Sequence, residues 1–128
     1  LAQLFMRLVF NILCGNTDDH ARNHAAFWNG KTLSLTPAYD ICPQNRTGNE
    51  ATQAMLISDN NRLSNLKSCL AAAPHFQLSV VEAKEIFDSQ CEAIEVHWGK
   101  VCDEAKLSVV DRKLFWQRQF LNPFLFEG

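Results

Sequence analysis

The chain has 128 residues, of which 47% are hydrophobic, and its 12 Lys and Arg against 14 Asp and Glu give a formal net charge of −2. This length and apolar content fit a single domain that buries roughly two-thirds of the surface exposed by its unfolded form. Because there is no basic excess and no Lys or Arg cluster longer than a pair, we expect no direct binding to nucleic acid.

The cysteines and the hydropathy pattern bear on the cellular compartment. The chain has 5 cysteines, an odd number without any C-x-x-C spacing, which favours reduced thiols over a disulfide framework. No apolar run reaches the roughly 18 residues that a membrane span needs, and residues 1 to 14 lack the small-residue cleavage site of a signal peptide. We therefore expect a cytoplasmic protein with no membrane segment.

The first predicted element is a helix over residues 1–13. Apolar residues recur there at i, i+3, i+4 and i+7, and Met6 and Phe10 make the other face partly apolar too, which predicts a helix buried nearly all round. Gly15 supplies the left-handed residue that often ends a helix, so irregular backbone should begin at Asn16. The loop that follows is thus attached to a core helix.

That loop, residues 16–24, concentrates amide, carboxylate and imidazole groups. Asp18 and Asn23 are five residues apart, the spacing that kinase catalytic loops use between the Asp that accepts the substrate hydroxyl proton and an Asn on magnesium. Asp18 is therefore the candidate general base, and Asn23 offers a neutral carbonyl oxygen to a hard cation such as Mg²⁺. The alternative is that Asp18 and Asp19 only cap a helix or a turn.

Other residues of the loop are open to two interpretations. His20 is a candidate phosphate contact, although a histidine that holds the loop by hydrogen bonds to backbone carbonyls is the favoured alternative. Asp19 and His24 are interpreted as a loop-bracing carboxylate and an imidazole at the start of a strand. Arg22 either neutralises phosphate or pairs with Asp19, and the sequence leaves both open.

A β-hairpin is predicted directly after the loop. Residues 25–28 and 32–35 flank Asn29-Gly30, the dipeptide best suited to a type I′ turn. A tight hairpin returns the chain to the neighbourhood of the loop that it left.

Asp40 is the second carboxylate of the candidate site. The hairpin should bring Asp40 within reach of the cation that Asn23 binds, and Pro37 fixes the backbone just before it. The alternative for Tyr39-Asp40 is a turn Asp beside a packed Tyr. The polar run over residues 44–50 stands where kinases keep a substrate-facing activation loop.

The rest of the chain is predicted to be a helical scaffold without an internal domain boundary. The apolar tail, residues 120–126, should pack on its own domain, with a docking surface as the alternative. The predicted elements are a strand or buried turn over 54–57, a helix over 64–73 stopped by Pro74, a long helix capped by Ser79 with Glu82, and a last helix from Ser108 with Asp111 through Phe120.

Two motifs resemble the C-terminal half of the HipA family of serine/threonine protein kinases: Thr-Asp-Asp-His-Ala-Arg-Asn at 17–23 and Tyr-Asp-Ile at 39–41. Residues 11–42 carry most of the specificity. The resemblance implies an α+β, predominantly α, fold like a kinase C-lobe, and transfer of the γ-phosphoryl group of ATP to a Ser or Thr hydroxyl of a protein substrate. The implied roles are catalysis for Asp18, and Mg²⁺ binding with contacts to ATP for Asn23 and Asp40. His20, two residues after Asp18, is the further residue expected to contact ATP.

The resemblance also implies partners. Members of the family commonly act as toxins paired with a small helix-turn-helix antitoxin. The chain holds no Gly-rich loop and no strand with a plausible nucleotide-binding Lys, so we expect one HipA-like C-terminal domain over residues 1–128, with the N-terminal lobe that covers the nucleotide absent.

Two other function classes remain open. One is a truncated regulatory or interaction module that keeps the fold without activity. The other is a metal-dependent hydrolase, because carboxylates and imidazoles suit Zn²⁺, Mn²⁺ or Fe²⁺. Its ligands would come from Asp18, Asp19, His20, His24 and Asp40.

Overall fold

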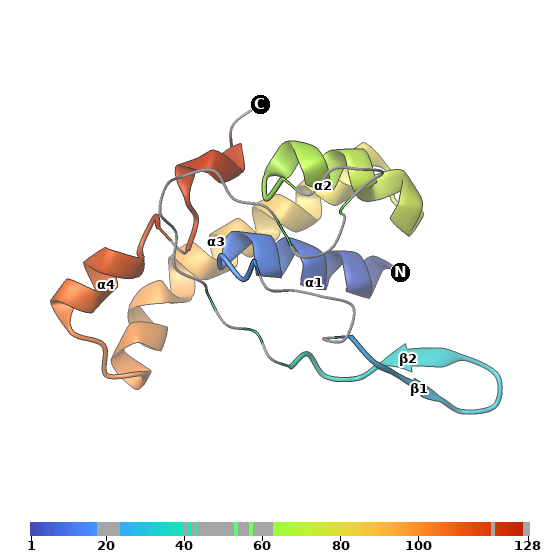
Figure 1. The fold of residues 1–128 in the computed structure, drawn as a ribbon, viewed down its shortest axis with the longest axis horizontal. Coiled ribbons are helices and arrows are strands. Elements are labelled where there is room, and N and C mark those ends of the chain that lie inside the picture. The colour runs from blue at the N-terminus through green and yellow to red at the C-terminus, as the bar shows by residue number, and fades with distance from the viewer. Residues whose placement is uncertain are drawn as a thin grey trace.

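The computed structural model describes residues 1–17, 24–39, 41, 43, 53, 57, 63–118 and 120–126. These residues form four α-helices, a two-stranded hairpin and two 3₁₀ turns (Figure 1). The predicted class, α+β and mainly helical, is confirmed. In chain order the elements are α1 (Ala2–Leu13), β1 (Ala26–Trp28), β2 (Leu33–Leu35), α2 (Leu66–Ala72), η2 (Ala73–Phe76), α3 (Val80–Glu104), α4 (Val109–Phe115) and η3 (Pro123–Phe126).

Helix α1 is the central element of the core. Its inner face packs on α3 and η2, and Phe5 and Val9 are fully buried there. The outer face differs from the prediction, because Met6 is 42% and Phe10 37% exposed. The prediction of burial nearly all round was wrong, because Met6 and Phe10 border open hollows beside α3.

The end of α1 follows the sequence signal. Gly15 adopts the left-handed conformation with φ 75°. The amide of Gly15 donates to the carbonyl of Ile12 at 3.2 Å, and the amide of Asn16 donates to the carbonyl of Asn11 at 2.8 Å. This pair of bonds is a Schellman motif, which satisfies the last helical carbonyls and turns the chain into the loop.

The hairpin forms where it was predicted, but its turn lies one residue later. The strands are antiparallel, with Trp28 opposite Leu33. The next pair in this register is Asn29 and Thr32, so Gly30 is the first of the two central residues of the turn. Gly30 has φ 93°, the conformation that a type II′ turn needs at that position, whereas a type I′ turn on Asn29-Gly30 would need a positive φ at Asn29 as well. The Asn29 side chain instead accepts the amides of Lys31 and Thr32 at 2.9 and 2.8 Å.

Helix α2 is shorter than predicted. Asn65 caps its N-terminus, because its side chain accepts the amide of Ser68 at 3.0 Å, so the helix begins two residues after Ser64. Pro74 does end the α-helix, yet the chain continues as the 3₁₀ turn η2, in which proline occupies an early position that needs no amide donor.

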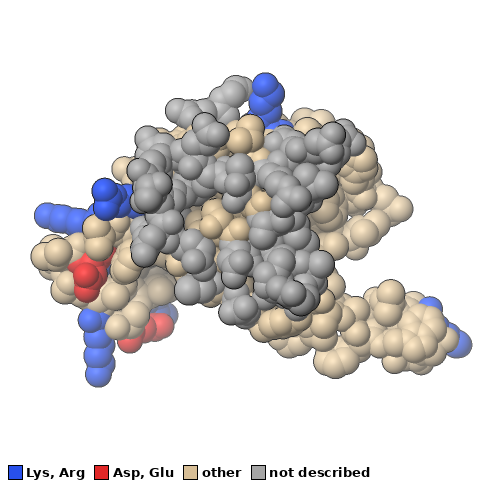
Figure 2. All heavy atoms as spheres, viewed as in Figure 1, with Lys and Arg blue, Asp and Glu red and all other residues tan. Residues whose placement is uncertain are grey.

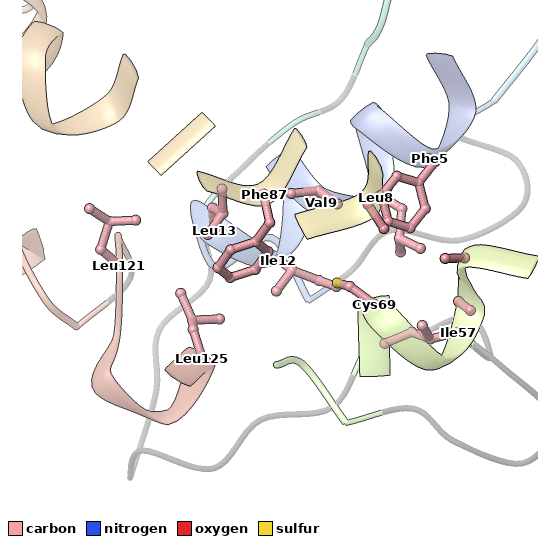
Figure 3. Close-up of a cluster of buried hydrophobic side chains, with 13 residues drawn as sticks. Phe5, Leu8, Val9, Ile12, Leu13, Ile57, Cys69, Phe87, Leu121 and Leu125 are labelled. Carbon is pink, nitrogen blue, oxygen red and sulfur yellow. The ribbon is translucent and has the colours of Figure 1, made fainter. Parts of the chain in front are cut away.

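Helix α3 lies across α1 and α2 and completes the core. Its predicted capping box is present: the Ser79 hydroxyl accepts the amide of Glu82 at 3.1 Å, and the Glu82 carboxylate accepts the amide of Ser79 at 3.2 Å. Figure 3 shows Phe87 of α3 beside Ile12 and Leu13 of α1. The buried hydrophobic cluster is Phe5, Leu8, Val9, Ile12, Leu13, Ile57, Cys69, Ala72, Ala73, Ala83, Phe87, Leu121 and Leu125.

The C-terminal part leaves the helix earlier than predicted. Helix α4 begins after the Ser108 cap as expected but ends at Phe115, because Gln117 turns left-handed with φ 61°. The tail then packs on its own domain, as predicted, since Leu121 and Leu125 are buried and the amide of Leu121 donates to the carbonyl of Leu13 at 2.9 Å. The predicted run 54–57 lies outside the described residues except for Ile57, which is buried in a bend.

In the part of the chain that the structure describes, no helix is long and apolar enough to cross a membrane.

Cys69, Cys91 and Cys102 are free thiols, consistent with the predicted reduced state. Burial raises the pKa of Cys69 to about 12. Desolvation, and then the charges of Asp88 and Glu95, raise the pKa of Cys91 to about 11.

Candidate active site

The predicted catalytic and metal-binding groups lie outside the described residues. The structure instead shows how the chain is held on both sides of them, at Asn16 and Thr17, at His24, and at Thr36 to Tyr39. The residues outside it are Asp18, Asp19, His20, Arg22, Asn23 and Asp40.

A buried amide network holds the start of the loop. Asn11 and Asn16 are 3% and 2% exposed, and the Nδ2 of Asn16 donates to the Oδ1 of Asn11 at 2.7 Å. The carbonyl of Asn16 accepts the Nε2 of Gln53, a buried residue 37 positions later, at 3.0 Å. Side chain, amide and carbonyl of Asn16 are therefore all bonded two residues before Asp18.

The base of the hairpin holds the other end. The amide of Thr36 donates to the carbonyl of Ala25 at 2.9 Å, which closes the hairpin next to His24. The carbonyl of Thr36 accepts the Nη2 of Arg7, which reaches it from α1. This contact attaches the base of the hairpin, at the end of β2, to α1. It also attaches the segment that leads to Asp40.

The two attachments lie one helical turn apart on α1. Arg7 and Asn11 are related by i, i+4, and the Nδ2 of Asn11 donates to the carbonyl of Arg7 at 3.0 Å. The same stretch of helix therefore fixes the start of the loop, its end, and the chain leading to Asp40. A site assembled from Asp18, Asn23 and Asp40 would have one rigid element as its support.

Some buried polar atoms of the domain, including two on the residues of these attachments, have unused hydrogen-bonding capacity. Within the described residues, the Nη1 of Arg7, the Oε1 of Gln53 and the Oγ of Ser64 are buried with no hydrogen-bond partner. A buried polar group without a hydrogen-bond partner lowers the stability of the fold by about 1–3 kcal/mol. The guanidinium of Arg7 thus keeps the amino group of its Nη1 for an acceptor beside the base of the hairpin.

The hairpin projects away from the helical body. Figure 2 shows it as an arm whose surface is uncharged except at the tip, where the sequence has Lys31. Phe27, Trp28 and Leu33 are 64%, 63% and 71% exposed. A two-stranded sheet with exposed apolar side chains is marginally stable in water by itself, so the hydrogen bonds at its base have to hold it in place.

The described residues contain no group of three His, Cys, Asp or Glu side chains that could hold a metal ion. Of the ligands considered for a hydrolase, His24 is described, and it is half-buried at the start of the hairpin. The two magnesium ligands implied for a kinase, Asn23 and Asp40, are not described. Their donor atoms, a carboxylate and an amide oxygen, are of the kind that Mg²⁺ prefers.

Sequence reasoning missed the residues that hold the loop. Arg7 and Asn11 have no part in the sequence-based prediction of the site, and Asn16 enters it only as the start of irregular backbone. A usable signal was present, because two polar side chains at i and i+4 in an otherwise apolar helix need buried partners. The partner of Arg7, the carbonyl of Thr36, lies 29 residues along the chain, and Gln53, which donates to the carbonyl of Asn16, lies 37 residues from it, so neither could be found that way.

Comparison with known families gives one match. The model of the HipA-like C-terminal domain, HipA_C, matches residues 1–98. This range covers α1, the hairpin, α2 and most of α3, and it includes both motifs at 17–23 and 39–41. No curated protein and no solved structure matches the chain.

Proposed function

The chain belongs to the family of HipA-like C-terminal domains, and from this membership we propose that it is the catalytic part of a serine/threonine protein kinase. The reaction is transfer of the γ-phosphoryl group of ATP to a hydroxyl of a protein substrate. The observation that carries the proposal is the family match, which spans both motifs. The double attachment to α1, through Arg7 to Thr36 and through Asn11 to Asn16, fits it.

Phosphoryl transfer needs this kind of support. Catalysis of the reaction is mostly positioning and charge stabilisation, and small misplacements of reacting groups lower the rate strongly. In the proposal Asp18 orients the substrate hydroxyl and accepts its proton, and Asn23 with Asp40 holds Mg²⁺. The cation would bridge phosphate oxygens and neutralise developing negative charge.

The nucleotide itself needs groups that residues 1–128 do not provide. A Gly-rich loop and a phosphate-binding Lys cover ATP in protein kinases, and we propose that a separate N-terminal lobe supplies them here. Contact of His20 with a phosphate belongs to the same proposal. A role as a toxin paired with a helix-turn-helix antitoxin rests on family membership alone, and co-expression with the neighbouring gene product, scored by relief of growth arrest, tests it.

The experiment compares Asp18→Asn with Asp19→Asn in a two-lobed kinase that carries this domain. Loss of the base should lower phosphate transfer to a Ser/Thr substrate by about 10²–10⁴-fold while ATP affinity hardly changes. Asp19→Asn is the matched control and should keep most of the activity. If the two variants rank in the reverse order, the base has been assigned to the wrong aspartate.

Metal content separates the kinase from a hydrolase. A kinase should bind Mg²⁺ together with nucleotide, whereas a hydrolase site should retain a transition metal through purification without added salts. Elemental analysis of the purified protein therefore gives opposite results for the two functions.

A further inference from the structure

The outer edges of α1 and α3 border two neighbouring hollows. The first has a volume of about 300 Å³ and is walled mainly by Phe10, Ile94, Trp98, Val101 and Phe120. The second, of about 390 Å³, is lined by Ala2, Met6 and Ile86 together with the exposed carboxylates Glu82 and Glu85. Neither hollow overlaps the residues that hold the predicted catalytic loop.

The two hollows are halves of one groove. Gln90 lines both, and its Nε2 donates to the carbonyl of Met6 at 2.9 Å, which joins α1 to α3 at the midpoint. On α1 the groove follows a single stripe with helical spacing, from Ala2 through Met6 to Phe10. On α3 it runs from Glu82 to Val101, 19 positions further along the helix, or about 28 Å at 1.5 Å per residue.

The halves differ in chemistry. Phe10 is 37% and Val101 52% exposed, so the first half presents apolar surface to solvent. The second half is acidic, and among the described residues that line it there is no Lys or Arg. Helix α3 carries five carboxylates between Val80 and Gly99 against one ammonium group, Lys84, which is paired with Asp88 at 3.1 Å.

We propose that this groove binds a basic amphipathic α-helix of a partner protein. Its apolar residues would lie between Phe10 and Val101, and its Lys and Arg side chains would face Glu82 and Glu85. An elongated groove with an apolar floor is the shape that accepts one face of a helix. A second copy of the chain is a poor occupant, because its own α3 would bring like charge to the acidic half.

The probe is a synthetic 21-residue helical peptide with Leu and Phe at i, i+3, i+4 and i+7. One version carries Lys on its N-terminal half and another on its C-terminal half, so that either direction of binding is sampled. Calorimetric titration of the 128-residue chain should show micromolar binding of one version. The same peptide with Glu in place of Lys should bind at least about tenfold more weakly.

Matched variants locate the contact. Val101→Glu puts a carboxylate in the apolar half and should weaken binding at least about tenfold. Val96→Glu, at a position that is also exposed on α3 (68%, against 52% for Val101) but lies outside the groove, should change it less than about twofold. Glu85→Lys should weaken binding about three- to fivefold, and the control Glu92→Lys should not.

Four results would overturn the proposal. They are no binding of either peptide at millimolar concentration, equal affinity for the Lys and Glu peptides, equal effects of Val101→Glu and Val96→Glu, and self-association of the chain that Val101→Glu dissolves. The last would place a second copy in the groove. None of these results depends on kinase activity, so the function proposed above stands or falls separately.

Discussion

The pair Asn11–Asn16 allows a sharp test of how the loop is held. Each side chain is buried, and the bond of 2.7 Å between them connects the last turn of α1 to the residue that precedes Thr17. Asn16→Ala removes the donor and leaves the Oδ1 of Asn11 buried without a partner. Asn11→Ala leaves the Nδ2 of Asn16 in the same position and also removes the bond to the carbonyl of Arg7.

The expected magnitudes follow from the penalty for a buried polar group without a partner. Each single variant should lower the free energy of unfolding by about 2 kcal/mol. In a chain of 128 residues this corresponds to roughly 6–10 °C in melting temperature. The double variant leaves neither group without a partner, so it should be less destabilised than the sum of the single variants by about 1–2 kcal/mol.

Urea unfolding of the four proteins, followed by circular dichroism, measures this coupling. As a control, Asn16→Ala combined with Lys67→Ala, an exposed residue of α2 that shares no partner with Asn16, should be additive. Additivity of Asn11→Ala and Asn16→Ala within about 0.3 kcal/mol would refute the argument that the two amides depend on each other.

Three further predictions concern the metal, the turn and the thiol. In a two-lobed kinase carrying this domain, Asp40→Asn should raise the Mg²⁺ concentration needed for half-maximal activity and lower turnover together, and an unchanged magnesium titration would contradict the ligand assignment. Gly30→Ala should destabilise the hairpin by about 1–2 kcal/mol, because its φ of 93° is strained for alanine although nothing lies within 4 Å of the added Cβ; hydrogen exchange of the Thr36 amide measures this effect. Gly99→Ala in α3, where the added Cβ also meets nothing within 4 Å, should stabilise the protein by about 0.5–1 kcal/mol, which global unfolding measures. Burial raises the pKa of Cys69 from 9.0 to about 12, so the contribution of the buried neutral thiol to stability is complete below pH 9 and is lost as the pH rises. At pH 10 the free energy of unfolding should be lower by about 1.4 kcal/mol, and Cys69→Ala should remove that part of the pH dependence of urea unfolding.

Local signals predicted the helices well. Gly15 ended α1, and Ser79 with Glu82 and Ser108 began α3 and α4, because capping bonds join residues within one turn of each other. The same kind of signal was overlooked at Asn65, which starts α2 two residues after the predicted position.

Tertiary contacts decided the elements that were predicted wrongly. Phe10 is apolar, as a buried residue would be, but it borders an open groove instead. The last helix stops at Phe115 because the chain turns to bury Leu121 and Leu125 against the core. The hairpin turn is centred on Gly30 and Lys31 instead of Asn29 and Gly30, because the pairing of the strands sets the register and the residue types at the turn do not determine it.

The candidate site divides in the same way. The motif spacing of Asp18, Asn23 and Asp40 is readable from the sequence, since the residues are close along the chain. The supports are not, because Arg7 reaches a carbonyl 29 residues away and Gln53 one 37 residues away. A one-dimensional pattern holds no information on which amide meets which carbonyl across such distances.

Helix α1 connects the loop with the groove without any need for a conformational switch. Arg7, Asn11 and the end of the helix hold the loop, and the stripe from Ala2 to Phe10 borders the groove. A peptide helix that binds only the folded domain adds RT ln(1 + [L]/Kd) to the domain's free energy of unfolding, where [L] is the free peptide concentration. This is about 2.7 kcal/mol when [L] is a hundred times Kd. That gain is comparable with the loss expected from Asn16→Ala, so saturating peptide should restore the melting temperature of this variant to near the wild-type value without contacting the loop.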